Sequence, residues 1–201
     1  MISRLKQKQV NLPIESRIHE KILIDKQSRV IQLIQAYRNR GHQKASLDPL
    51  DLKPQRYCEE LEIGFHGLEK SDLSTTFRTD PLKINKDIAS LTEIIDALEK
   101  IYCGNLGIEY NHISNMQERM WFQQRLELNL GKIDFTDLEK KYILKRLSSA
   151  EGLAKFLASR YPGMKRFGID GAESLIPLVD SLIQNCGIFD AEQVCIGMAH
   201  R

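Results

Sequence analysis

Helix signals dominate this sequence, and the clearest lies at residues 90–102, which read SLTEIIDALEKIY. Ser90 is followed three residues later by Glu93, the pattern of a capping box, in which each of the two side chains accepts a hydrogen bond from a free backbone N–H group. The pattern recurs ahead of three other apolar runs, at Ser114/Gln117, Thr136/Glu139 and Ser148/Glu151. We therefore expect helices near 90–102, 115–128, 136–147 and 149–160.

A longer amphipathic helix is predicted from about Ile14 to Arg40, and Gly41 is expected to end it. Its apolar residues recur at spacings of three and four, at Ile18, Ile22, Val30, Leu33, Ile34 and Tyr37. Prolines and glycines interrupt any period between residues 41 and about 67, which indicates an ordered but irregular connection. Residues 1–13, rich in Lys and Gln, are expected to form a disordered or frayed terminus.

The helical spacing of apolar residues is interrupted at Tyr161-Pro162-Gly163. A helix is expected to begin between Glu173 and Ile176, so that Pro177 falls in its first turn, where a missing N–H is tolerated. Residues 193–198 form a short apolar run, for which we predict a buried parallel strand. A helix, a loop and an apolar strand are typical of the start of an α/β layer. The predicted fold is therefore mostly α, with a helical region at 14–160 and the incomplete start of an α/β domain at 161–201.

The composition narrows the class of protein. The 201 residues include 29 Lys and Arg against 27 Asp and Glu, a balance that does not favour nucleic acid or an anionic membrane as a partner. The sequence contains no apolar run long enough to span a bilayer, and no secretory signal opens it. Its four cysteines contain no C-x-x-C pair, as is typical of free thiols in a reducing compartment. We expect a globular, cytoplasmic protein.

Few residues suggest chemistry by themselves. The five histidines have no familiar metal-ligand spacing, so a metal site made by this chain alone is not expected. Arg38, Arg40 and His42 form a compact basic cluster. These cations either interact with the C-terminal dipole of a helix or contact an anion such as a phosphate. His200 is placed at the end of the predicted strand, where active groups of open α/β sheets gather, and is a candidate functional histidine.

Five blocks carry a family resemblance, and they stand in order along roughly residues 29–201. They are VIQLIQAYRNRGHQ (30–43) followed by LDPL (47–50); YCG (102–104) with GIEYNHI (107–113); WFQQRLE (121–127); YPGMKRF (161–167) continuing to LIP (175–177); and GMAHR (197–201). The series resembles 2-oxoglutarate dehydrogenase, the thiamine-diphosphate-dependent decarboxylating component of the 2-oxoglutarate dehydrogenase complex. We expect the chain to be an N-terminal fragment of such an enzyme, and residues 161–201 to begin its thiamine-diphosphate-binding, transketolase-like domain.

The resemblance implies an activity, partners and site residues. The enzyme would be a homodimer of the tricarboxylic acid cycle that decarboxylates 2-oxoglutarate with thiamine diphosphate and Mg²⁺. It would then transfer the succinyl group to the lipoyl group of the partner succinyltransferase. By resemblance His200 contacts the substrate or an intermediate as a catalytic residue, and Phe167 lines the same cleft. Arg166 is a further substrate-binding candidate, because the substrate is a dianion.

The sequence also departs from the family. The thiamine-diphosphate motif, a Gly-Asp-Gly followed by paired asparagines, is absent, and Gly168-Ile169-Asp170-Gly171 does not replace it. The main ligands of the cofactor and its metal are therefore expected beyond residue 201, and the chain alone is expected to be inactive. One alternative is a non-catalytic helical module that binds a partner or a regulatory ligand, supported best by Arg38, Arg40 and His42. Another is a degraded gene product with no function.

Overall fold

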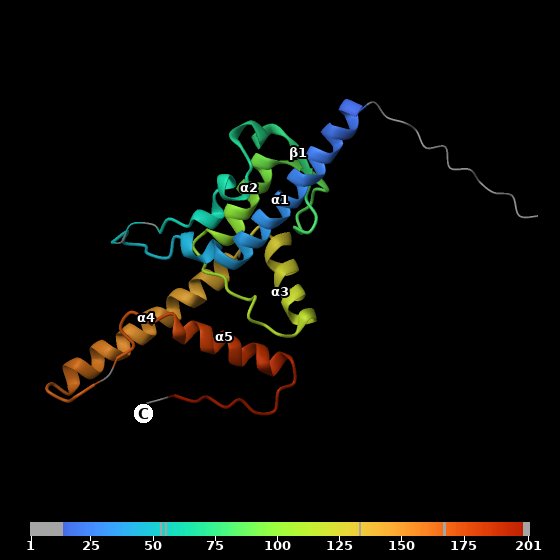
Figure 1. Ribbon diagram of the computed structural model, residues 1–201. Helices are drawn as coiled ribbons and strands as arrows, with labels where there is room; N and C mark the ends of the chain where they lie inside the picture. Colours follow the sequence, from blue (N-terminus) through green and yellow to red (C-terminus); the bar gives the residue numbers. More distant parts are fainter. Residues whose placement is uncertain (1–13, 53, 55, 133, 167, 199–201) are drawn as a thin grey trace, which may run out of the picture. The chain divides into compact units, whose positions relative to one another are not determined.

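The computed structural model describes residues 14–198 except 53, 55, 133 and 167. The chain divides between residues 133 and 134 into two compact units, which we describe separately. Helices account for most of the regular structure (Figure 1), so the predicted mostly α fold class is confirmed.

The described part of the first unit contains three α-helices, α1 (Ile14–Lys44), α2 (Leu91–Tyr102) and α3 (Met116–Leu128). Between α1 and α2 the chain forms short 3₁₀ helices and two strands: η1 (Glu59–Leu61), η2 (Ile63–His66), η3 (Lys70–Ser74), β1 (Thr76–Arg78) and β2 (Ile88–Ser90). The two strands pair antiparallel, with Phe77 opposite Ala89. The connection after α1 is therefore ordered and largely irregular, as its prolines and glycines predict.

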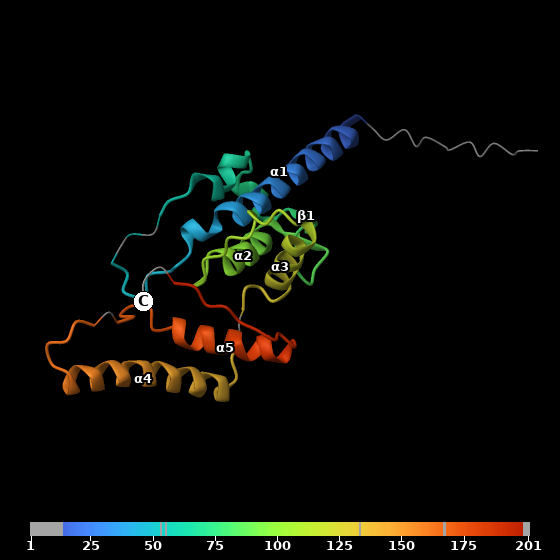
Figure 2. The same ribbon diagram turned by 90° about the horizontal axis from the view of Figure 1, so that it is seen from below.

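Helices α1 and α2 pack side by side and supply most of the core of this unit (Figure 2). Each contributes apolar residues three or four apart, the spacing of a single helix face. They are Val30, Leu33, Ile34 and Tyr37 from α1, and Leu91, Ile94, Leu98 and Ile101 from α2. The predicted apolar face of the first helix is thus confirmed over Val30–Tyr37, whereas Ile22 is exposed.

Gly41 does not end α1, and that prediction is wrong: the helix continues to Lys44. A Cβ atom at Gly41 would lie 2.5 Å from the Cβ of Tyr102 at the end of α2. The glycine therefore allows two helices to approach closely, a role that a single-sequence pattern does not distinguish from a helix stop.

Two of the four predicted capping boxes form. At α2, the Ser90 hydroxyl accepts from the Glu93 N–H at 3.3 Å, and the Glu93 carboxylate accepts from the Ser90 N–H at 2.9 Å. Thr136 and Glu139 make the same pair at α4 (Asp137–Arg160). The other two predictions are wrong. Asn115 rather than Ser114 caps α3, since its side chain accepts from two backbone N–H groups of the first turn.

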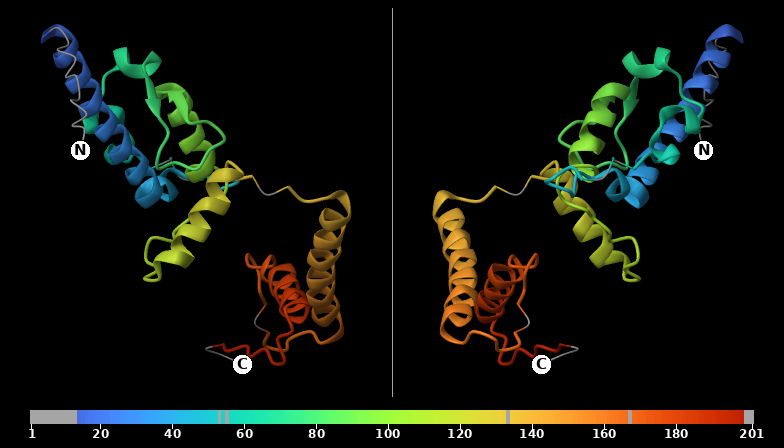
Figure 3. Two further views of the ribbon diagram at one scale, coloured as in Figure 1. Left: turned by 90° about the vertical axis from the view of Figure 1, so that its right-hand side faces the viewer. Right: turned by 90° about the vertical axis from the view of Figure 1, so that its left-hand side faces the viewer.

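Ser148 lies inside α4, which runs unbroken for 24 residues instead of forming two helices. Ser148 and Ser149 do not stop the helix, because its backbone hydrogen bonds continue past them, and the Ser149 hydroxyl donates to the Lys145 carbonyl of the preceding turn. The second unit adds α5 (Leu175–Ile188), which lies beside α4 (Figure 3). This helix begins where predicted, with Pro177 in its first turn.

The strand predicted at residues 193–198 is not present: residues 191–198 have no regular secondary structure. A strand is stabilised by a neighbouring strand, and residues 192–198 make no backbone hydrogen bond to another described residue. Nothing in the described chain therefore shows the start of an α/β layer. The predicted domain boundary at 160/161 stays a prediction, whereas the structural division places α4 and α5 together.

Candidate functional site

The three predicted site residues all belong to the second unit, Asp134–Arg201. Phe167 and His200 lie outside the described residues. Arg166 is exposed on the segment between α4 and α5, where it forms no ion pair with another described residue. Their roles remain predictions.

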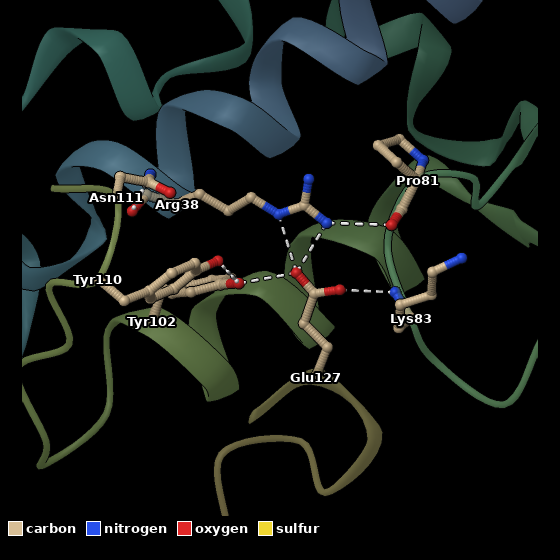
Figure 4. Close-up of polar contacts among 7 residues, drawn as sticks. All are labelled: Arg38, Pro81, Lys83, Tyr102, Tyr110, Asn111 and Glu127. Atoms are coloured by element: carbon tan, nitrogen blue, oxygen red, sulfur yellow. Dashed lines mark hydrogen bonds and ion pairs between the residues drawn. The ribbon is translucent and has the colours of Figure 1, made fainter. Parts of the chain in front are cut away.

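The first unit contains a buried polar network centred on Glu127, whose side chain is 0% exposed (Figure 4). One carboxylate oxygen accepts from Arg38 Nε at 2.8 Å and from the Tyr102 hydroxyl at 2.7 Å. The other accepts from the backbone N–H of Lys83 at 2.7 Å. Both carboxylate oxygens of Glu127 are therefore engaged.

Four separate parts of the first unit meet at this carboxylate. Arg38 comes from α1, Tyr102 from the end of α2, Glu127 from the last turn of α3, and Lys83 from the loop that joins β1 and β2. Arg38 also donates to the carbonyl of Pro81 at 3.0 Å, in the same loop. The network thus ties α3 to the core that α1 and α2 form.

The buried tyrosines of the network are neutral hydrogen-bonding groups. Burial, assisted by the negative charge of Glu127, raises the pKa of Tyr102 far above its ordinary value. Burial also raises the pKa of Tyr110, whose hydroxyl lies 3.0 Å from that of Tyr102. Because the pair is buried and both carboxylate oxygens of Glu127 already accept hydrogen bonds, neither oxygen is free for a substrate, and we assign the pair a structural role.

The basic cluster of Arg38, Arg40 and His42 does not converge on one point. Arg38 pairs with Glu127 inside the core, whereas Arg40 lies 3.3 Å from the carboxylate of Glu60. His42 Nε2 lies 3.9 Å from Glu109, and its Nδ1 is buried without a hydrogen-bond partner among the described residues. Each of the three side chains thus faces its own carboxylate. Only His42 of the three falls in the last turn of α1, where a positive charge would favour the helix dipole.

Two of the hollows that the described residues form are notable for their size. One, of about 510 Å³, lies at the end of α1 and is lined mainly by polar residues, including His42, Gln43, Ser46, Asp48 and Arg56. The other, of about 910 Å³, is a mainly apolar groove between α4 and α5.

The described residues do not fit the cofactor that the family resemblance implies. Mg²⁺ prefers several oxygen ligands, but no group of three or more His, Cys, Asp or Glu side chains within the described part of the chain is placed to hold a metal ion.

Nothing in the sequence predicts that Glu127 is the centre of a buried network. A glutamate at the end of a predicted helix is normally exposed, so its type and spacing do not indicate burial. Tyr102, Tyr110 and Glu127 each fall within a block that carries the family resemblance, which is the only signal that singles them out.

Comparisons with known proteins identify relatives along most of the chain, although no protein-family model matches it. The chain is 49% identical over 183 residues to the 2-oxoglutarate dehydrogenase E1 component of Azotobacter vinelandii, a match that covers 91% of this chain and 19% of the relative. The chain is a homologue of the 2-oxoglutarate dehydrogenase E1 components. The component from Cupriavidus necator is 41% identical, over 85% of this chain and 18% of its own length.

A third relative, the multifunctional 2-oxoglutarate metabolism enzyme of Mycolicibacterium vanbaalenii, is 41% identical over 88% of this chain and 14% of its own length. The family resemblance drawn from the five blocks is thus confirmed. The chain spans less than a fifth of the length of each of these E1-type relatives. Among the described helices, none is both long and apolar enough to cross a membrane.

Proposed function

We propose that this chain is the N-terminal part of a 2-oxoglutarate dehydrogenase E1 component. The whole component decarboxylates 2-oxoglutarate with thiamine diphosphate and Mg²⁺, and it passes the succinyl group to the lipoyl group of a partner succinyltransferase. The component works as a cytoplasmic homodimer. The observation that carries this proposal is the 49% identity to the Azotobacter vinelandii E1 component over 91% of the chain.

Within that component, this chain contributes substrate contacts rather than the cofactor site. His200 donates a hydrogen bond to the substrate and stabilises charge that develops during decarboxylation. Phe167 lines the same cleft, and Arg166 binds a carboxylate of 2-oxoglutarate. The exposure of Arg166, without an ion-pair partner among the described residues, supports its availability for a substrate anion. Residues outside this chain hold thiamine diphosphate and its metal.

The test is a chimera in which residues 14–201 replace the corresponding segment of the Azotobacter vinelandii E1 component. We expect it to decarboxylate 2-oxoglutarate in preference to other 2-oxoacids when thiamine diphosphate and Mg²⁺ are supplied. A folded chimera that prefers another 2-oxoacid, or that has no activity, contradicts the proposal.

Two variants of the chimera test the individual roles. Removing a positioned proton donor costs about 10²- to 10⁴-fold in rate, so His200→Ala should lower kcat by about that factor, whereas Arg166→Met should mainly raise KM. His112→Ala is the matched control, because His112 is an exposed histidine of the first unit and should leave both constants nearly unchanged.

The alternative, a helical module that binds a regulatory ligand, has lost its best support. Arg38 is buried in an ion pair and Arg40 lies against Glu60, so the basic cluster does not present a joint anion site. Isothermal calorimetry with nucleotides and acyl-coenzyme A should therefore give the same result for the wild-type chain and for an Arg40→Ala variant.

A further inference from the structure

The segment between α4 and α5 contains Arg166, for which we propose a contact with a carboxylate of 2-oxoglutarate. Arg166 is exposed and belongs to no helix or strand. A long side chain on an irregular segment binds an anion well only if the backbone beneath it is held in place, because a displacement of about 1 Å can cost about 100-fold in rate. The contacts that fix this backbone therefore bear on substrate binding.

A tight turn follows Arg166 in the chain. The Ala172 N–H donates to the carbonyl of Ile169 at 2.7 Å, and Gly171 between them has a φ of 83°. Residues with a Cβ atom rarely adopt this left-handed conformation. A Cβ atom at Gly171 would meet nothing within 4 Å, so the shape of the backbone, rather than a lack of space, requires glycine here.

The side chain of Glu173 closes this turn. Its Oε1 atom accepts a hydrogen bond from the Gly171 N–H at 2.9 Å. Hydrogen bonds from the Gly171 N–H and from its own N–H lower the pKa of the Glu173 carboxyl group, so the group is ionised at neutral pH. A hydrogen bond to an ionised acceptor is about twice as strong as one between neutral groups. Glu173 is also half-buried, whereas Ala172 and Ser174 on either side of it are exposed.

The turn continues directly into α5. The Leu175 N–H donates to the carbonyl of Ala172 at 2.9 Å, and the Ile176 N–H donates to the carbonyl of Glu173 at 3.1 Å. The backbone of Glu173 thus takes part in the first hydrogen bonds of the helix, while its side chain holds the turn that precedes it.

Helix α5 is in turn fixed to α4, which lies beside it (Figure 3). Arg146 of α4 donates from Nε and Nη2 to the two carboxylate oxygens of Asp180 of α5, both at 3.2 Å. The Tyr142 hydroxyl donates to the same carboxylate. A two-point contact between Arg and a carboxylate fixes orientation as well as distance, so the turn before α5 starts from an anchored helix.

We propose that Glu173 is a positioning residue for substrate binding. By accepting the Gly171 N–H it fixes the turn that follows Arg166, and so holds the Arg166 side chain where it meets a carboxylate of the substrate. The inference rests on the proposed function, and it adds a residue that lies outside the five blocks of family resemblance.

The charge of Glu173 favours this indirect role over a contact with the substrate. 2-Oxoglutarate is a dianion, and a second negative charge in contact with it would be repelled. One carboxylate oxygen of Glu173 is already engaged with the backbone of Gly171. Glu173 therefore acts through the position of Arg166, and the substrate meets the arginine.

Isothermal calorimetry with glutarate, a dicarboxylate without the reacting keto group, tests the proposal on the chimera with the Azotobacter vinelandii component. We expect Glu173→Ala to weaken glutarate binding about tenfold, because Arg166 is no longer held in place. Glu173→Gln should stay within about twofold of the unsubstituted chimera, because an amide oxygen also accepts the Gly171 N–H. Glu151→Ala is the matched control and should not change the affinity, since Glu151 is an exposed residue of α4 that lies 2.6 Å from Lys155 of the same helix.

A double-mutant cycle with Arg166→Met separates positioning from a general loss of structure. If Glu173 acts through Arg166, Glu173→Ala should change the affinity for glutarate by less than about twofold once Arg166→Met is present. A loss of equal size with and without Arg166 overturns the inference. An unchanged affinity of Glu173→Ala in the chimera that retains Arg166 overturns it as well.

The outcomes separate this inference from the proposed function, because glutarate binding does not require decarboxylation. A chimera that decarboxylates 2-oxoglutarate but shows no coupling between Glu173 and Arg166 overturns the positioning role and leaves the function standing. A folded, inactive chimera that binds glutarate with this coupling supports the positioning role and overturns the function. A folded chimera that does not bind glutarate overturns the positioning role.

Discussion

Glu127 shows at the residue scale how one side chain can organise a small helical unit. Its carboxylate is 0% exposed and receives hydrogen bonds from Arg38, Tyr102 and the backbone of Lys83. Charged groups are rarely buried unless they are paired, because desolvation costs several kcal/mol per ion. The surrounding donors offset this cost, and they fix the position of α3 on the unit.

We expect Glu127→Gln to destabilise the first unit strongly. The amide keeps the shape of the side chain but leaves the Arg38 guanidinium buried without a counter-charge, and breaking a buried ion pair costs about 3–5 kcal/mol. Urea unfolding followed by circular dichroism measures the loss. Glu118→Gln, at an exposed position of the same helix, should cost less than about 1 kcal/mol. Equal losses in the two variants would contradict a special role for the buried pair.

Gly41 and Gly152 make a second comparison at this scale. A Cβ atom at Gly41 would lie 2.5 Å from Tyr102 Cβ, whereas one at Gly152, inside α4, would have no neighbour within 4 Å. Gly41→Ala should therefore destabilise the protein by about 1–3 kcal/mol through overpacking. Gly152→Ala should stabilise α4 by about 0.5–1 kcal/mol, because alanine favours the helix. Thermal unfolding should shift in opposite directions for the two variants.

At the scale of elements, the beginnings of the helices depend on their caps. Thr136 caps α4, but Ser148, within a sequence pattern of the same kind, is an interior residue of that helix. The structure thus distinguishes two chemically similar positions that the capping-box pattern treats alike.

Thr136→Ala should therefore cost about 1 kcal/mol of helix stability, while Ser148→Ala should cost nothing measurable or stabilise slightly. Far-UV circular dichroism across a thermal transition compares them. If Ser148→Ala were the more damaging variant, α4 would consist of two separately capped helices.

The cap of α2 makes its stability depend on pH. Hydrogen bonds from Lys86 and Ser90 lower the pKa of Glu93 from 4.5 to about 2. A carboxylate with a lowered folded-state pKa adds stability above its ordinary pKa and loses it as the pH falls through the folded value. The stability of the first unit should thus decline between about pH 4.5 and pH 2.

Glu93→Gln should flatten that decline, because the amide does not titrate. The check is the free energy of unfolding measured at several pH values between 7 and about 2. Lys100→Met removes an exposed charge from the same helix and should not change how the free energy of unfolding varies with pH. An unchanged slope in Glu93→Gln would show that other groups cause the acid sensitivity.

On the scale of the whole molecule, the two units differ in what they bury. The first has a core made chiefly by α1 and α2, whereas the described residues of the second bury no side chain. Burial of apolar area is the main source of folding free energy, so the two units should not be equally stable.

Residues 1–133 expressed alone should consequently unfold cooperatively in urea, with a free energy of unfolding close to that of the whole chain. Residues 134–201 expressed alone should lose their helical signal gradually, without a cooperative transition. Circular dichroism on the two pieces and the intact chain decides this. A sharp transition in the second piece would mean that α4 and α5 form a sufficient core by themselves.

Sequence patterns alone predicted which regions are helical, although they divided α4 into two helices and ended α1 too early. They also predicted the apolar face from Val30 to Tyr37, two of the caps and the family resemblance, because these depend on local periodicity, on neighbours three or four residues apart and on ordered blocks. Tertiary structure alone decided that Gly41 admits the end of α2 and that Glu127 is buried, because both depend on residues distant in the sequence. The strand predicted at 193–198 is missing for a related reason, because strand formation also depends on residues distant in the sequence. Its apolar pattern is local, but a strand exists only when another strand supplies its hydrogen bonds.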